Sequence, residues 1–353
     1  MTSSPIIFWT TRDWVEAIAA LPADGPLPCR TVLVPRERVA HALRRELIRA
    51  GHASVLAGTR FIPVPAAAAA VLQAAGVEFT PGEEALRASR LLALFHEPLQ
   101  LQHFSTRLLE EKPGWDEAFG RTITDLEAAG LSPEALEAEG DARLTDVATI
   151  WRALNRLAGA SWTTARIYRE AVSLLERQPT LWPFPGPALV TAMGHETGAE
   201  ASFLRSIPGA TLGLLAARPL RERHLERVEA VYGRAARTAL LAAPPRASAT
   251  ERDLLASYLF EPPRVLGDPT RPRSTGPDDT VRLEEHAGVE AELEATADWV
   301  AEQVADGIAL EDIAVLLPSL DPLAALVAER LGRLPWHDGT MPTPEGACRP
   351  AMP

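Results

Sequence analysis

The chain has 353 residues, of which 46% are hydrophobic and 23% are charged, and its formal net charge is −12. This composition is typical of a folded globular protein, and the length allows two or three domains with a large buried core. The negative charge argues against coating of nucleic acid through bulk charge, although it allows a local basic groove. No apolar run approaches the ~20 residues that span a bilayer, and the N-terminus lacks the pattern of a secretory signal.

The cysteines and histidines give no sign of a metal site. Cys29 and Cys348 lie far apart in the sequence and form neither a disulfide framework nor a zinc pattern. The eight histidines also lack the spacing of metal ligands. We therefore expect a cytoplasmic protein with no metal, no cofactor and no membrane partner.

The first eighty residues alternate strand and helix signals. An apolar run at 6–9 leads through a polar turn at 10–12 into a helix. The segment "TVLVP" (31–35) predicts a buried strand, and the helix after it is closed by Gly51. An extended segment follows, and "AAAAAVLQAAG" (66–76) predicts a further helix.

The middle of the chain has a different pattern. Residues 81–178 are nearly all helical in periodicity. The segments "PALVTAMGH" (187–195) and "ATLGLLA" (210–216) then predict two more buried strands with a helix between them. A second helical stretch ends near residue 241, and the Pro- and Gly-rich segment 261–279 is the clearest linker.

After this linker the pattern is strand, helix, strand, helix. Three acidic residues lie near the start of the first helix, where they suit the helix dipole. Gly307 closes that helix, and "DIAVLLP" (312–318) predicts the second strand. The apolar positions of the first helix follow helical spacing; they are Leu293, Ala297, Val300 and Val304.

This order of parts resembles superfamily I helicases of the UvrD/RecB kind. Their second motor domain has an acidic helix, a strand of the form "G…-x-D-I-A-V-L", a helix and an "IPY"-like turn. In the family this strand ends in Arg-Ser, whereas this chain has Pro318 and Ser319, so the role of that arginine does not carry over. The earlier segment "CRTVLVPRERVAHALRREL" is most similar to AddB subunits of bacterial helicase–nucleases, at a motif that touches single-stranded DNA.

The resemblance implies an α/β fold: a RecA-like parallel-sheet motor domain with an all-helical insertion, followed by the start of a second RecA-like domain. The expected boundaries can be given as ranges. The first domain is 1–80 with 183–245, the insertion is 81–182, the linker is 246–279, the second domain is 280–340, and the unstructured tail is 341–353.

The residues that would bind ATP are missing. The single lysine, Lys112, follows two glutamates and precedes a proline, so the chain contains no Walker A loop. Where the family has Gly-Lys-Thr and the Walker B carboxylates, this chain has other residues, and two separate losses predict a domain without ATP hydrolysis. The degenerate ATP-site positions are Thr10, Thr11, Arg12, Thr191 and Ala192.

The helix after residues 31–35 has separate apolar and basic faces. Val39, Leu43, Leu47 and Ala50 share one face, and a basic stripe runs along another. Guanidinium groups beside a strand end could hold phosphates, although for any single arginine a solvated surface is the favoured explanation. The DNA-binding candidates are Arg36, Arg38, Arg45 and Arg49.

We therefore expect an ATPase-inactive, AddB-like subunit of a helicase–nuclease. It would bind DNA or scaffold a partner helicase or nuclease subunit in double-strand-break repair by recombination. The resemblance implies that the DNA is single-stranded. The carboxylate–lysine set of the family's PD-(D/E)XK nuclease is absent after residue 337, so we expect no nuclease site and a chain truncated before that domain. The alternative is a protein-interaction scaffold with no nucleic-acid role; a nucleotide-sugar enzyme or methyltransferase would require a glycine-rich first turn, which is absent.

Overall fold

The described chain forms two units. The computed structural model describes residues 5–8, 10–22, 29–111, 113–216, 222–242, 250–258, 267, 278–319, 321 and 323–333. The first unit comprises Met1–Ala249 with Asp253–Arg273, and the second comprises Thr250–Arg252 with Ser274–Pro353. Most of the linker predicted at 261–279 and all of the tail predicted at 341–353 lie outside the described residues.

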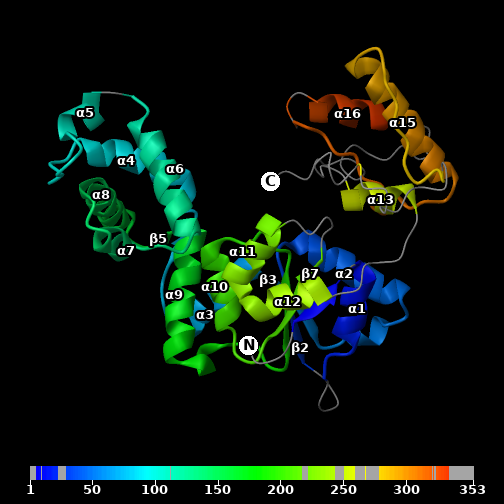
Figure 1. Cartoon of the computed structure of the whole chain (residues 1–353), viewed down its shortest axis with the longest axis horizontal. Helices are drawn as coiled ribbons and strands as arrows, with labels where there is room; N and C mark the ends of the chain where they lie inside the picture. The colour runs from blue at the N-terminus through cyan, green and yellow to red at the C-terminus, as the bar shows by residue number, and fades with distance from the viewer. Residues whose placement is uncertain are drawn as a thin grey trace. The chain divides into compact units, whose positions relative to one another are not determined.

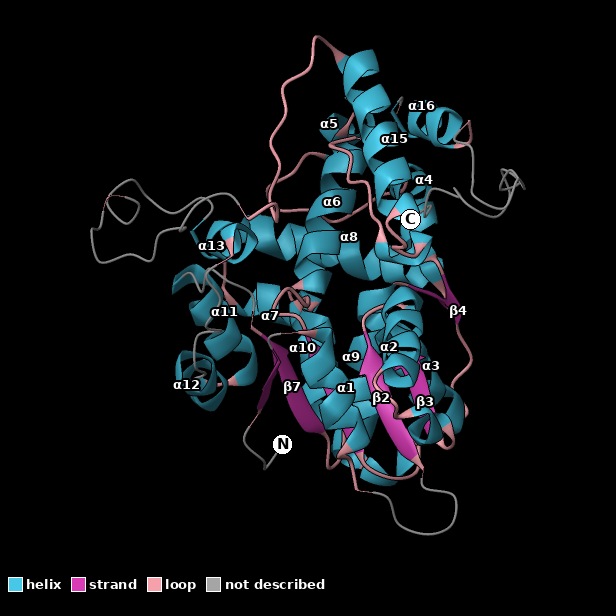
Figure 2. Cartoon of the chain, turned by 90° about the vertical axis from the view of Figure 1, so that its right-hand side faces the viewer, coloured by secondary structure: helices cyan, strands magenta, loops and turns pink. Residues whose placement is uncertain are grey.

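The first unit is built on a parallel sheet. Its five described strands are all paired in parallel, in the order β1-β7-β6-β2-β3. Figures 1 and 2 label β2, β3 and β7 of this sheet. The α/β class predicted from the sequence is therefore confirmed. The strands are β1 Ile6–Phe8, β2 Arg30–Val34, β3 Thr59–Pro63, β6 Ala188–Ala192 and β7 Thr211–Leu215.

The central strands β2 and β6 are covered on both faces and consist mainly of apolar residues. Every residue of β2 and β6 is buried, as expected for parallel strands between two helical layers. Successive side chains point to opposite faces: Val32 and Val34 join one core, whereas Leu33 joins the other.

The helices divide between the two faces of the sheet. Helices α1 (Thr11–Ala19) and α2 (Glu37–Arg49) pack on one face. Connections between parallel strands are right-handed, so a chain that reverses direction along the sheet must change face. Helices that contribute to the second core are α3 Val64–Ala74, α9 Thr164–Arg177, α10 Gly198–Ser206, α11 Glu222–Tyr232 and α12 Arg234–Ala242.

The segment between β3 and β6 contains a helical insertion with its own core. Its aromatic centre is Phe95, Phe119 and Trp151, all buried away from the sheet. Figure 1 shows these helices to one side of the sheet. They are α4 Arg87–Phe95, α5 Thr106–Glu111, α6 Trp115–Ala128, α7 Pro133–Ala138 and α8 Ala142–Ala158.

The two ends of the insertion are tied together. Strand β4 (Thr80–Pro81) pairs in parallel with β5 (Ser161–Trp162), and Phe79 stacks on Trp162 at 5.4 Å between ring centroids. Helix α9 follows directly, and it packs on α3 and α10 rather than on the insertion core. This short two-stranded pairing therefore marks where the chain leaves the sheet layer and returns to it.

The second unit contains helices but none of the predicted strands. Helices α15 (Val289–Ala305) and α16 (Leu323–Leu331) form where the sequence indicates, and Leu293, Ala297 and Val300 are buried as expected. The strands expected near residue 280 and at 312–318 are wrong for the described residues, which are irregular there apart from Asp312 at the end of a 3₁₀ turn.

The failed strands have a simple physical cause. Apolar alternation produces a strand only where a neighbouring strand accepts its backbone hydrogen bonds. Leu283 is 95% exposed and Leu316 is 92% exposed, and neither segment pairs with a strand among the described residues. Helix α13 (Glu251–Tyr258) is the remaining described helix of the C-terminal third. No helix in the described ranges has both the length and the apolar character to cross a bilayer.

Substitution of Gly213 by alanine is expected to destabilise the first unit. Gly213 lies in β7, and a Cβ atom there would stand 2.1 Å from Cε2 of the buried Phe8 ring. Overpacking of this kind costs about 1–3 kcal/mol of unfolding free energy. Urea unfolding of the purified variant, followed by circular dichroism, measures the loss.

Gly120→Ala provides the matched control. A Cβ atom at Gly120, inside helix α6, would meet Leu91 Cδ1 at an ordinary 3.5 Å. Alanine also favours a helix over glycine by about 0.8–1.0 kcal/mol, so this variant should be neutral or more stable. Equal stability of the two variants would contradict the close approach between β7 and Phe8.

Candidate functional site

The sheet reverses its winding direction between β2 and β6. From β2 the chain proceeds to the neighbouring edge strand β3, whereas from β6 it proceeds the other way to β7. In open parallel sheets, ligands bind beyond the carboxyl ends of the strands at such a reversal. Here the segments beyond those ends are Arg36, before α2, and the loop Met193–Thr197, before α10.

The turn after β1 is a helix cap. Thr10 has an extended backbone, its hydroxyl accepts the Asp13 backbone N–H at 3.3 Å, and its own N–H donates to Asp13 Oδ2 at 2.8 Å. This capping box uses groups within the chain to satisfy donors at the start of α1. Thr11 and Arg12 are exposed beside it. The turn therefore caps a helix at the position where the sequence predicts a degenerate phosphate loop.

The residues at the end of β6 also use their polar groups inside the protein. The Thr191 hydroxyl donates to the Leu33 carbonyl oxygen at 2.5 Å and so links β6 to β2. Thr191 and Ala192 are both buried. Neither side chain can act as a carboxylate ligand for Mg²⁺, and among the described residues no group of three histidine, cysteine or acidic side chains is placed to hold a metal.

The first carboxylate beyond β6 turns back onto its own loop. Glu196 is buried, and its carboxylate accepts the Gly194 backbone N–H at 3.0 Å and the Met193 N–H. Arg227 of α11 donates to the Glu196 carbonyl oxygen at 2.8 Å. Because these bonds hold its oxygens, Glu196 stabilises the loop rather than facing the open edge of the sheet.

His224 of α11 lies against the same loop. A Cβ atom at Gly194 would stand 2.4 Å from His224 Cε1, and Gly194 has a φ of +80°, so only glycine fits. Burial and the neighbouring Arg227 lower the pKa of His224. Its Nε2 atom is buried without a partner among the described residues. At neutral pH the ring therefore packs as an uncharged group.

A second carboxylate lies beside Glu196. Burial and repulsion from Glu196 raise the pKa of Glu200, although the Thr197 backbone N–H and His195 offset part of this effect. Burial and Glu196 also raise the pKa of Tyr232. The sequence places both glutamates just past the end of β6, but only the tertiary structure brings Tyr232 of α11 beside them.

The predicted arginines lie on and before α2 but differ in exposure. Arg36, Arg38 and Arg49 are exposed, whereas Arg45 is only half-exposed and its Nε atom is buried. Arg49 lies 3.9 Å from Glu46. The buried face of α2 consists of Ala40, Leu43 and Leu47. The expectation for Ala50 was wrong, because Ala50 ends the helix and is exposed.

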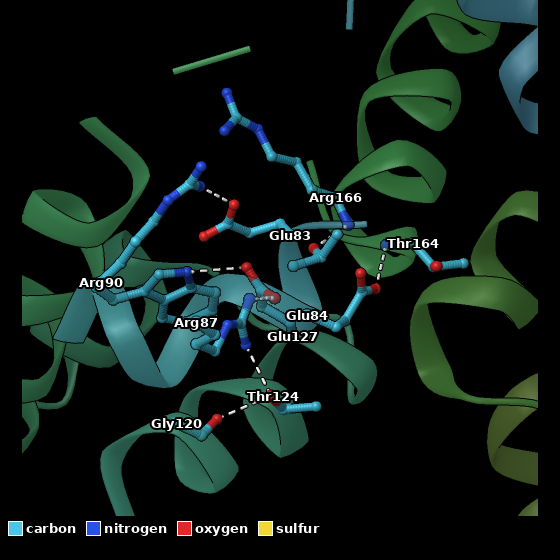
Figure 3. Close-up of polar contacts among 11 residues, drawn as sticks. Glu83, Glu84, Arg87, Arg90, Gly120, Thr124, Glu127, Thr164 and Arg166 are labelled. Atoms are coloured by element: carbon cyan, nitrogen blue, oxygen red, sulfur yellow. Dashed lines mark hydrogen bonds and ion pairs between the residues drawn. The ribbon is translucent and has the colours of Figure 1, made fainter. Parts of the chain in front are cut away.

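A buried polar cluster lies in the insertion (Figure 3). Arg87 of α4 and Glu127 of α6 form an ion pair at 2.6 Å, with side chains only 4% and 2% exposed. Trp151 Nε1 donates to the other Glu127 oxygen at 3.0 Å, and Arg87 donates to Thr124 Oγ1 at 2.7 Å. Both carboxylate oxygens are thus occupied, so the pair holds three helices together.

The comparisons with known proteins give no family. No family model matches the sequence, and the search of curated proteins returned no match either. The functional conclusion therefore rests on the residues and on the fold.

Glu200→Gln is expected to stabilise the protein at neutral pH. Because the folded pKa is raised above the ordinary 4.5, the folded state binds more protons than the unfolded chain between those two values. The free energy of unfolding therefore falls as the pH rises through this window, and it does not recover at higher pH. The variant lacks this loss, so its urea midpoint should exceed that of the wild type at about pH 7.5 and approach it at about pH 4.

The exposed Glu176 of α9 supplies the control for this titration. Glu176→Gln removes the same charge without removing a buried carboxylate, so its stability should follow the wild type at both pH values. A Glu200→Gln variant that is no more stable than Glu176→Gln near neutral pH would contradict the assignment.

Glu127→Ala is expected to cost about 3–5 kcal/mol, because it leaves the Arg87 guanidinium buried without a counter-charge. Glu117→Ala in the same helix is the control. It removes an exposed partner of Arg121, and such pairs contribute about 0–1 kcal/mol. Urea unfolding monitored by tryptophan fluorescence separates the two, and equal losses would show that the buried pair is not the stabilising contact.

Proposed function

We propose that this chain is an ATPase-inactive, helicase-like subunit that binds single-stranded DNA through the exposed arginines of α2. In this proposal it serves a helicase–nuclease of the AddB kind in double-strand-break repair by recombination, and a partner subunit supplies ATP hydrolysis. The observation that carries it is the row of exposed cations, Arg36, Arg38 and Arg49, which begins at the reversal point of the sheet.

The architecture supports this proposal. A parallel sheet interrupted between β3 and β6 by a helical insertion agrees with the order of parts expected from the resemblance. The Thr10 turn and the end of β6 use their polar groups for capping and for strand-to-strand bonds. Such a domain can position a strand without hydrolysing nucleotide.

The charge distribution supports a local DNA contact rather than bulk attraction. The chain carries a net charge of −12, so long-range attraction to a polyanion is weak and binding must come from short-range contacts with phosphates. Arg36 and Arg38 lie within one helical turn of each other at the start of α2, and Arg45 and Arg49 lie about one turn apart at its end. Guanidinium groups form paired hydrogen bonds with phosphate oxygens.

A triple variant tests the proposal. Replacing Arg36, Arg38 and Arg49 together by alanine should weaken binding of a fluorescent oligothymidine by about tenfold or more at low salt. The slope of log K against log salt should become shallower by about 2, since each lost contact with single-stranded DNA contributes ~0.7. Fluorescence anisotropy across a salt series measures both quantities.

Arg107, Arg121 and Arg143 provide a control with the same change in charge. All three are exposed on the insertion and paired with acidic neighbours, so their replacement should leave the salt slope unchanged. No salt-sensitive binding by the wild type would overturn the proposal in favour of a protein-interaction scaffold. Turnover of ATP by the purified chain would contradict both functions.

A further inference from the structure

A basic hollow opens among helices α7, α8 and α9 of the first unit. Its volume is about 640 Å³. Arg152 and Arg156 line it from α8, one helical turn apart, and Arg166 and Arg169 line it from α9. None of these residues belongs to the edge of the sheet or to α2, so the hollow is a separate feature of the molecule.

The positive charge in this hollow is only partly neutralised. Arg152 is held by Glu134 at 3.2 Å and by Glu137 at 2.6 Å. Arg169 lies 4.0 Å from Glu170. Arg156 is exposed and has no hydrogen bond or ion pair within the described residues. Four arginines stand against three carboxylates, Glu134 and Glu170 of the lining and Glu137 beside it, so the hollow keeps a net positive charge.

Arg166 is held in place but lacks a hydrogen-bond partner at one nitrogen. Its guanidinium lies over the Trp162 ring at 4.4 Å from the centroid. Its Nη1 atom is buried and has no partner among the described residues. Burial lowers the pKa of Arg166, Glu170 offsets part of this shift, and the nearby Arg169 adds to it. Figure 3 shows the guanidinium extending away from the Arg87–Glu127 pair, with no dashed line to it.

We propose that this hollow binds a phosphate group, through Arg156 and Arg166 with Arg169 beside them. A phosphate compensates the excess positive charge of the guanidinium groups that line the hollow. Its tetrahedral oxygens accept paired bonds from more than one guanidinium, which a single carboxylate cannot do as fully. Asn155 and Ser132 line the same hollow and supply neutral hydrogen-bonding groups.

The phosphate is presented either by a nucleic-acid strand or by a small phosphorylated molecule. Both sources present the same phosphate group to the hollow. Competition between an oligothymidine and bound pyrophosphate distinguishes them. The inference does not depend on DNA binding by α2, because the probe that tests the hollow is a small anion.

Isothermal titration of the full chain with inorganic pyrophosphate, at constant ionic strength set with sodium chloride, tests the proposal. The wild type should bind saturably, and pyrophosphate should raise its thermal midpoint by mass action. The double variant Arg156→Ala/Arg166→Gln should lose at least about tenfold in affinity. Arg177→Ala is the control, since Arg177 is exposed on α9 and lies outside the hollow.

An oligothymidine titrated against bound pyrophosphate separates the two sources. Displacement that persists in the α2 triple variant assigns the hollow to a strand, and no displacement assigns it to a small phosphorylated molecule. The α2 variant should keep its affinity for pyrophosphate, so failure of the DNA proposal and failure of this one are distinguishable.

Two results would overturn the inference: no pyrophosphate binding by the wild type, or equal affinity in the double variant and in Arg177→Ala. If the double variant does not fold, Arg156→Glu decides alone, because Arg156 is exposed and has no partner to lose. Its affinity for pyrophosphate must fall by at least about tenfold for the proposal to stand.

Discussion

The handedness of the connections between parallel strands organises the first unit. The chain moves one way along the sheet through β2 and β3, and returns the other way through β6 and β7. Right-handed crossovers then place α1 and α2 on one face and α3, α9 and α10 on the other. The two sets of connections diverge at the carboxyl ends of β2 and β6, where Arg36 and the Glu196 loop lie.

A second constraint determines the geometry of the insertion. Its ends are joined by the β4–β5 pairing, and Glu84 adds a bond to the backbone N–H of Thr164 at the start of α9 (Figure 3). The buried Arg87–Glu127 pair connects α4 to α6, and Trp151 extends that connection to α8. These contacts hold the helix that carries Arg156 within the insertion, while α9 packs on the sheet side with Arg166. The basic hollow therefore depends on how the insertion meets the sheet layer.

The polar groups near the sheet edge fall into two kinds. Thr10, Thr191 and Glu196 form hydrogen bonds inside the protein, and these bonds cap a helix, join two strands and close a loop. Arg36 and Arg38 are instead exposed, and the Nη1 atom of Arg166 has no hydrogen-bond partner among the described residues. Both proposals follow from this division, since a group already bonded within the fold must break that bond before it can hold a ligand.

Local sequence patterns determined much of this protein. The strands β2 and β6 and the helices α2 and α15 could be predicted from the sequence. A strand buried on both faces gives a continuous apolar run, and a helix buried on one face gives apolar residues three or four positions apart. Tertiary structure decided the rest. Arg87 and Glu127 lie 40 residues apart in the sequence, and they pair only because α4 packs on α6. The bond from Gly194 to the Glu196 carboxylate likewise depends on the folded loop and has no signature in the residue spacing. The apolar segments around Leu283 and Leu316 are no strands in the described residues, since a strand exists only where another chain segment completes its hydrogen bonds.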